Sequence, residues 1–153
     1  MRSLELMVPP PAVAAVVALA MWGISLVTPP LYIPAAVRLT ACAAFALAAV
    51  VFSVAGVVSF RRARTTVNPT KPEAASSLVS SGIYHVTRNP MYVGLSFVLF
   101  AWAIFLSSAW VLLGLLAFVL YIGRFQIAPE ERALSKLFGS EYTAYQAKVR
   151  RWL

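Results

Sequence analysis

The chain has 153 residues, enough for a single domain, and 61% of them are hydrophobic. That share is far above the usual composition of a soluble domain and predicts an integral membrane protein. The net charge of +8 would suggest a nucleic-acid partner in a soluble protein, but here the bases flank apolar segments. We therefore expect contact with the lipid bilayer and its anionic headgroups, and no nucleic acid. The one cysteine, Cys42, excludes an internal disulfide and a thiolate metal site.

Two apolar runs fill the first part of the chain, at residues 12–27 and 39–60. The first could be a signal peptide, but no small-x-small cleavage site closes it and a Pro-Pro pair follows, so we interpret it as a retained helix. The second is uncharged and long enough to span a membrane. Small residues four apart, such as Ala49 and Ser53, predict close packing against another helix. Residues 1–64, which end in a basic stop, thus form two predicted membrane helices.

Residues 65–88 form the one long non-hydrophobic segment, and prolines at its start exclude a regular helix there. Two more apolar runs follow at residues 91–106 and 109–125, joined by a Ser-Ser pair. Both are slightly short for a full crossing, which predicts a tight, tilted hairpin. Such a hairpin returns Arg124 to the membrane face that holds Arg88.

The end of the chain is charged and amphipathic. Pro129 is expected to open a separate helix, with Glu130 and Glu131 in its first turn, and Gly139 to kink or divide it. The pattern is typical of a helix that lies on the membrane. Its apolar side comprises Leu134, Leu137, Phe138, Tyr142, Tyr145, Val149 and Trp152, and its basic side Lys136, Lys148, Arg150 and Arg151.

The distribution of basic residues predicts the orientation. Of the 13 Lys and Arg, only Arg38 falls near a loop on the far side. By the positive-inside rule, residues 65–88 form a cytoplasmic loop and both termini are cytoplasmic. The sequence thus predicts an all-α protein of about four transmembrane helices in an inner or plasma membrane.

Polar residues at the start of the third apolar run predict a ligand site. Asn89 is a good N-cap, Pro90 fits the first helical position, and the free N–H groups of that turn make an anion site beside Arg88. The hairpin also brings Tyr92, Arg124, Gln126, Glu130 and Glu131 to this face. The adjacent carboxylates could bind a divalent metal, but no residue with ligand spacing supports them, so no metal site is expected.

The same pocket, with an anion site, aromatic rings and carboxylates, suits a zwitterionic ligand with extra positive charge. The sequence contains no Ser–His–acid constellation, P-loop or G-x-G-x-x-G motif. Hydrolase, nucleoside-triphosphatase and Rossmann dehydrogenase activities therefore have no support.

Four stretches resemble the integral membrane methyltransferases, which include isoprenylcysteine carboxyl methyltransferases and phospholipid N-methyltransferases. They are Ser81-Gly82-Ile83-Tyr84, Arg88-Asn89-Pro90-Met91-Tyr92-Val93-Gly94, Glu130-Glu131 and Phe138-Gly139-Ser140-Glu141-Tyr142-x-x-Tyr145. The resemblance covers residues 67–153. It implies one methyltransferase domain, 1–153, whose residues 65–153, with the amphipathic C-terminal helix, form the site for S-adenosylmethionine.

Carried over position by position, the resemblance implies cofactor contacts from Ser76, Ser77, Leu78, Val79, Tyr84, Asn89, Pro90, Met91, Tyr92 and Glu130. It implies roles in the reaction for Arg88, Gln126, Glu130 and Glu131. The residue types agree, because Glu130 can accept from an ammonium group and the Asn89-Pro90 helix start can meet a carboxylate.

One departure concerns the methyl acceptor. The prenylcysteine enzymes place an arginine four residues before the matching glutamate, where this chain has Gln126, and Arg124 would point elsewhere on a helix. A neutral amide suits a lipophilic or amphipathic acceptor other than a prenylcysteine carboxylate. A phospholipid N-methyltransferase and a non-catalytic membrane subunit that binds a headgroup stay open as alternatives, as does the oligomeric state.

Overall fold

The computed structural model describes residues 5–64 and 75–153, and in these ranges it contains helices and no strand. The expected all-α membrane fold is confirmed. The helices are α1 (Pro10–Val27), α2 (Ala35–Arg62), η3 (Gly82–His85), α3 (Pro90–Leu106), η4 (Ala109–Val111), α4 (Leu112–Ile122), η5 (Gly123–Ile127) and α5 (Ala128–Lys148). Of the expected loop at residues 65–88, the structure describes residues 75–88, and residues 65–74 lie outside the described ranges.

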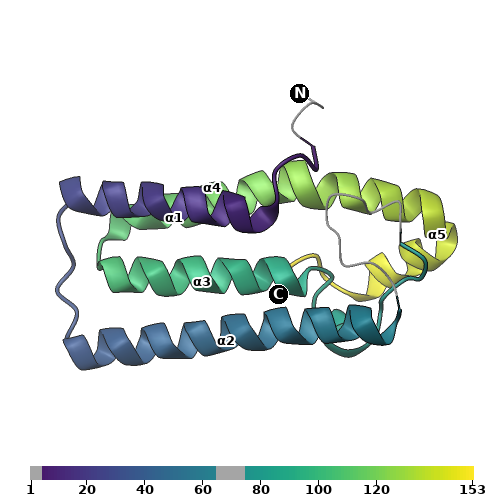
Figure 1. Cartoon of the computed structure of the whole chain (residues 1–153), viewed down its shortest axis with the longest axis horizontal. Coiled ribbons are helices and arrows are strands. Elements are labelled where there is room, and N and C mark those ends of the chain that lie inside the picture. Colours follow the sequence, from purple (N-terminus) through teal and green to yellow (C-terminus); the bar gives the residue numbers. More distant parts are fainter. Residues whose placement is uncertain (1–4, 65–74) are drawn as a thin grey trace.

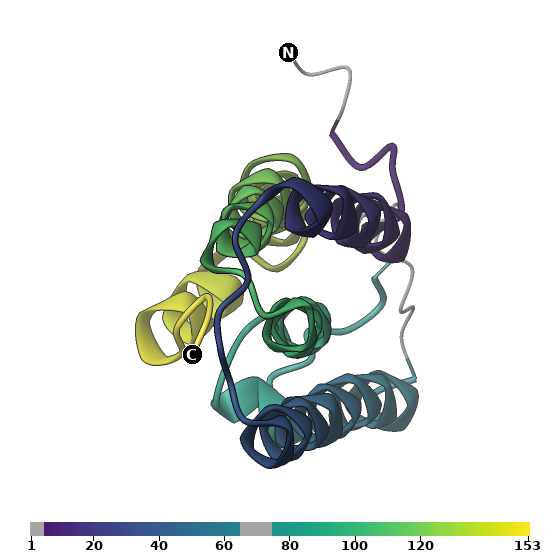
Figure 2. The same cartoon turned by 90° about the vertical axis from the view of Figure 1, so that its left-hand side faces the viewer.

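The long helices lie side by side, and α3 runs through the middle of the bundle (Figures 1 and 2). It packs against α1, α2 and α4, while α5 extends beyond the bundle at the end where α2 finishes and α3 begins. Among the described residues, α1, α2 and the continuous helix from Ala109 to Lys148 are long and apolar enough to cross a membrane, and α3 is a shorter apolar helix. Many large apolar side chains point outward, as lipid contact requires.

Small residues set the contact between α2 and α3. A Cβ added at Gly94 would clash with the Ser53 hydroxyl and lie 3.1 Å from the Ala49 carbonyl oxygen. A Cβ at Gly56 would lie 2.9 Å from Met91 Cγ. The close packing predicted from Ala49 and Ser53 is confirmed, since backbones approach this closely only where side chains are small.

Pro129 does not open a separate helix, so that prediction was wrong. Helix α4 continues into α5 through the π-helical turn η5, where the Ala128 N–H donates to the carbonyl of Gly123, five residues earlier. A wider turn accommodates the proline without breaking the helix. Because Pro129 has no N–H, the carbonyl of Phe125 loses its α-helical donor, and it accepts the Leu6 N–H instead, at 3.1 Å.

Helix α5 bends at Gly139, as expected, where φ is 51° and ψ is −122°. Its apolar side packs on the chain itself rather than on a membrane surface. Tyr142, Tyr145 and Val149 form a buried cluster with Val79 and Tyr84. The expectation that this face contacts lipid was therefore wrong for these residues, because the segment around η3 covers it.

The α2–α3 contact generates a stability prediction. Gly94→Ala should lower the stability by about 1–3 kcal/mol, because the backbone of α2 cannot move away freely. Gly23→Ala is the matched control, since an added Cβ there meets nothing within 4 Å. Thermal unfolding in detergent measures both variants. Equal melting temperatures for the two would contradict the packing assignment.

Candidate functional site

A buried polar cluster joins α3 to the α4–α5 junction. The Tyr92 hydroxyl donates to Glu130 Oε1 at 2.5 Å, and Gln126 Nε2 donates to the same oxygen at 2.8 Å. Tyr92 is 6% exposed and Gln126 2%. Gln126 and Glu130 are four residues apart and therefore lie on one face of the helix. The structure thus brings three predicted site residues into contact.

Glu130 has hydrogen-bond donors but no cationic partner among the described residues. Within residues 5–64 and 75–153, the ion pairs involve Glu5 and Glu131 and leave Glu130 out. A largely enclosed carboxylate without a counter-charge is unfavourable, and a bound cation would relieve it. The cluster is therefore suited to the ammonium group of a ligand.

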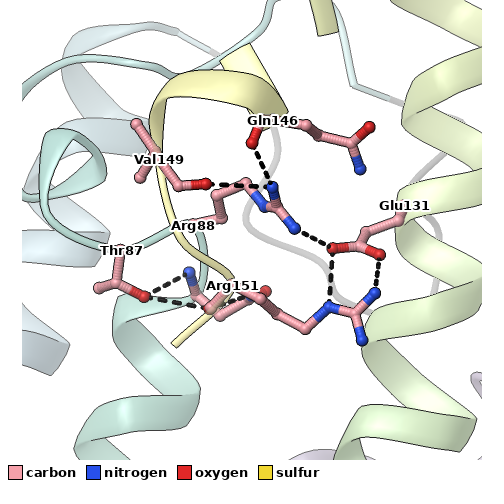
Figure 3. Close-up of polar contacts among 7 residues, drawn as sticks. Thr87, Arg88, Glu131, Gln146, Val149 and Arg151 are labelled. Carbon is pink, nitrogen blue, oxygen red and sulfur yellow. Dashed lines mark hydrogen bonds and ion pairs between the residues drawn. The ribbon is translucent and has the colours of Figure 1, made fainter. Parts of the chain in front are cut away.

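Glu131 faces a different environment from its neighbour. Arg88 Nη2 lies 2.8 Å from Glu131 Oε1, and Arg151 Nη2 lies 2.5 Å from Glu131 Oε2 (Figure 3). Arg88 Nη1 also donates to the carbonyls of Gln146 and Val149, at 3.0 and 3.1 Å. The guanidinium thus caps the negative end of α5, where a cation is favourable.

Asn89 occupies the N-cap position of α3 and Pro90 opens the helix, as predicted, but the Asn89 side chain makes no capping hydrogen bond. Its Nδ2 donates to the carbonyl of Arg151 at 2.9 Å, and the Thr87 hydroxyl donates to the same oxygen at 3.2 Å. The Arg88 N–H bonds the carbonyl of Arg150 at 2.9 Å. The segment after α5 is thus bound across the start of α3.

The predicted cofactor residues that precede α3, Ser76 to Val79, lie beside the end of α2 and the apolar cluster of α5. Ser76 Oγ and Ser77 Oγ donate to the carbonyls of Arg64 and Ala63, at 3.4 and 3.0 Å. Leu78 packs against the buried cluster of α5 that contains Val79 and Tyr84. These contacts hold the segment in place at the end of α2.

Tyr84 links this apolar cluster to the polar one. Its carbonyl accepts the hydroxyl of Tyr145 at 2.7 Å. Burial raises the pKa of Tyr84 above its ordinary value, and the nearby Tyr145 and Glu130 raise it further. The phenol therefore stays neutral at physiological pH. Because Glu130 contributes to this shift, the two side chains lie near each other, and the structure places a fourth predicted residue beside the cluster.

Pro90 and Met91 are predicted cofactor contacts whose side chains face α2, near Gly56. Arg124 and Gln126 point in different directions, as the sequence suggested. The Arg124 side chain is 55% exposed and pairs with Glu5, whereas Gln126 is buried. The part of the chain that the structure describes contains no group of three potential metal ligands.

Sequence reasoning missed three contributors. Thr87 and Arg151 hold the C-terminal segment against α3, and Glu5 bridges Arg124 and Arg132. A Thr two residues before an N-cap position is a local signal that could have indicated Thr87. The ion pairs join residues far apart in the sequence, and no local pattern marks them.

An open apolar groove of about 660 Å³ lies farther along the bundle. Alanines of α1, Cys42 and Ala46 of α2, and large side chains of α3 from Leu95 to Phe105 line it. It lies among helices that are apolar enough to be embedded in lipid. Hydrocarbon chains can therefore reach it from the side.

The Arg88 network generates a prediction. Arg88→Met should destabilise the fold by about 3 kcal/mol, because it leaves Glu131 with one partner and two carbonyls without a donor. Arg150→Met is the control, as the exposed Arg150 side chain forms no ion pair with the described residues. Thermal unfolding in detergent measures the melting temperatures of both variants. A melting temperature of Arg88→Met equal to that of the wild type would show that the Arg88 network does not stabilise the fold.

Comparisons with known proteins identify the family of this chain. A family model described as phospholipid methyltransferase matches residues 37–141. An uncharacterized protein of Haemophilus influenzae (strain ATCC 51907 / DSM 11121 / KW20 / Rd) is 48% identical over 63 residues, which are 41% of this chain and all of that protein. No solved structure matches. Since the family model covers more than half of it, this chain belongs to the phospholipid methyltransferase family.

Proposed function

We propose that this protein transfers a methyl group from S-adenosylmethionine to a lipophilic or amphipathic acceptor at the membrane. Family membership supports a membrane methyltransferase. The observation that carries the proposal is the Glu130 carboxylate, which Tyr92 and Gln126 orient and which no cation of the described residues neutralises. An ammonium group of the cofactor would supply the missing charge.

The residues around Glu130 fit such a cofactor. In this proposal Glu130 accepts from the ammonium group, with Tyr84 and Tyr92 beside it, and Leu78 and Val79 offer apolar surface to the adenine. Ser76, Ser77, Asn89, Pro90 and Met91 complete the predicted contacts around the start of α3. When bound, S-adenosylmethionine supplies an electrophilic methyl group on a positively charged sulfur. The chain's own contribution is to hold the reactants in line and to exclude water.

Arg88 and Glu131, which the resemblance places in the reaction, are proposed to act indirectly, by positioning Glu130. Arg88 and Glu131 bond each other, the end of α5 and Arg151. We infer that they position the start of α5 and thereby aim Glu130 at Tyr92. Gln126 aids by donating to the same carboxylate.

The surroundings of Gln126 support an acceptor without a carboxylate. Its amide is neutral and bonded to Glu130, and Arg124 points outward toward Glu5. Neither offers a cation to an acceptor carboxylate inside the site. An amine, thiol or hydroxyl on a molecule with a hydrocarbon chain fits better, and the family match makes a phospholipid amine the second candidate. The apolar groove gives such chains a place beside α3.

We further propose that residues 1–153 form one domain, with the site in residues 65–153, and that the site and both termini face the cytoplasm. Leu6 bonds Phe125, which ties the start of the chain to the later half. The arginines of the network lie at the site end of the bundle, and Arg38 bonds Ser107 at the other. This distribution agrees with the positive-inside rule.

Glu130→Gln tests the proposed function. The variant keeps the size and the hydrogen bonds of the side chain but loses its charge, so affinity for S-adenosylmethionine should fall at least about tenfold. Glu141→Gln, on the exposed side of the same helix, should bind normally. Calorimetry on detergent-purified protein measures both. Equal affinities for wild type and Glu130→Gln would rule the assignment out, and donor binding without methylation of any acceptor would favour a non-catalytic subunit.

Cysteine labelling tests the orientation. In a Cys42→Ala background, single cysteines at Ser76 and Leu153 should react with an impermeant maleimide only after the membrane is opened. A cysteine at Tyr32, which is 97% exposed in the loop between α1 and α2, should label in intact cells. The reverse pattern would overturn the proposed orientation.

A further inference from the structure

A carboxylate of the chain itself occupies a basic surface on the outer side of the α4–α5 junction. Glu5 Oε1 lies 3.3 Å from Arg124 Nη1, and Glu5 Oε2 contacts Arg132 Nη2. The Glu5 side chain is 13% exposed, whereas those of Arg124 and Arg132 are 55% and 53% exposed. The two guanidinium groups thus converge on one anion and still face the surroundings. Figure 1 shows the segment before α1 reaching this junction.

The segment that carries Glu5 is bound to the junction by these ion pairs and by a backbone hydrogen bond. Leu6 donates its N–H to the Phe125 carbonyl that Pro129 leaves free. Leu6 itself has a φ of 59°, a left-handed conformation that is unfavourable for a leucine. Ion pairs to largely exposed arginines add little net stability. Glu5 is therefore an occupant that a stronger anion can displace.

The net charge of this surface and its place along the helix indicate which kind of anion could replace Glu5. Two guanidinium groups against one carboxylate leave one positive charge, and the exposed Lys136 lies one helical turn beyond Arg132. Arg124 is the first charged residue after the apolar run of α4, where lipid headgroups begin. It faces away from the buried Gln126, so this surface is separate from the Glu130 cluster.

We propose that Arg124 and Arg132 form a binding site for a phosphate monoester on an anionic lipid, and that Glu5 fills this site when the lipid is absent. A phosphate monoester carries more charge and more acceptor oxygens than a carboxylate, and the guanidinium fork matches its geometry. The inference is independent of the proposed methyl transfer. The lipid bound here is a ligand of the outer surface and not the methyl acceptor.

The experiment is a titration of the full chain in detergent with dioctanoyl phosphatidate, followed by calorimetry. Glu5→Gln should bind at least about threefold more tightly than wild type, because a tethered competitor has been removed. Arg124→Ala/Arg132→Ala should bind at least about tenfold more weakly. Glu141→Gln removes one negative charge from the exposed surface of α5 and should leave the affinity unchanged, which controls for net charge.

Two further ligands identify the source of the phosphate. Dioctanoyl phosphatidylcholine and inorganic phosphate should both bind more weakly than phosphatidate. Inorganic phosphate that binds equally well, with the same dependence on Glu5, would overturn the lipid assignment in favour of a soluble anion. Unchanged or weaker phosphatidate binding by Glu5→Gln would overturn the site itself, because a purely structural Glu5 predicts that result. If the double variant does not fold, Arg132→Ala alone gives the same comparison.

Discussion

The arrangement of α3, α5 and the C-terminal segment around the candidate site depends on the ion pair between Arg88 and Glu131. It joins the start of α3 to the start of α5, and the same guanidinium bonds the carbonyls of Gln146 and Val149 at the far end of α5. The ion pair and the hydrogen bonds donated by Nη1 and Nη2 stabilise this partly buried guanidinium. One side chain therefore fixes both ends of α5 relative to α3, and the C-terminal segment follows by bonding Asn89 and Thr87.

The adjacent glutamates show how helix geometry assigns different roles to identical side chains. Successive residues of a helix point about 100° apart. That rotation directs Glu131 to Arg88 and Arg151, and Glu130 to Tyr92 and Gln126. One carboxylate is neutralised within the fold. The other is oriented by neutral donors and has no cationic partner among the described residues, which is the property that a site for a cationic ligand needs.

The π turn η5 connects the membrane bundle to this site. It lets the helix pass Pro129 without a break, and within it Gln126 faces inward and Arg124 outward. The carbonyl freed at Phe125 is satisfied by Leu6, which brings Glu5 to the outer arginines. A single missing N–H thus couples the segment before α1 to the helix that carries Glu130.

Local sequence patterns determined the parts of this protein that depend on neighbouring residues. The apolar runs predicted the membrane helices, Ala49 and Ser53 the close contact with α3, and Gly139 the bend in α5, because each follows from side-chain size or periodicity along one element. The motif that contains Glu130 also indicated the family before the fold was known.

Only the tertiary structure decided which groups satisfy the buried charges and carbonyls. Asn89 is an ideal N-cap by residue type, yet it bonds Arg151, 62 residues away, and Arg88 bonds Glu131, 43 residues away. The apolar side of α5 meets η3 rather than lipid for the same reason. A polar or apolar group takes whatever partner the fold brings nearest, and residue type fixes the need for a partner but not its identity.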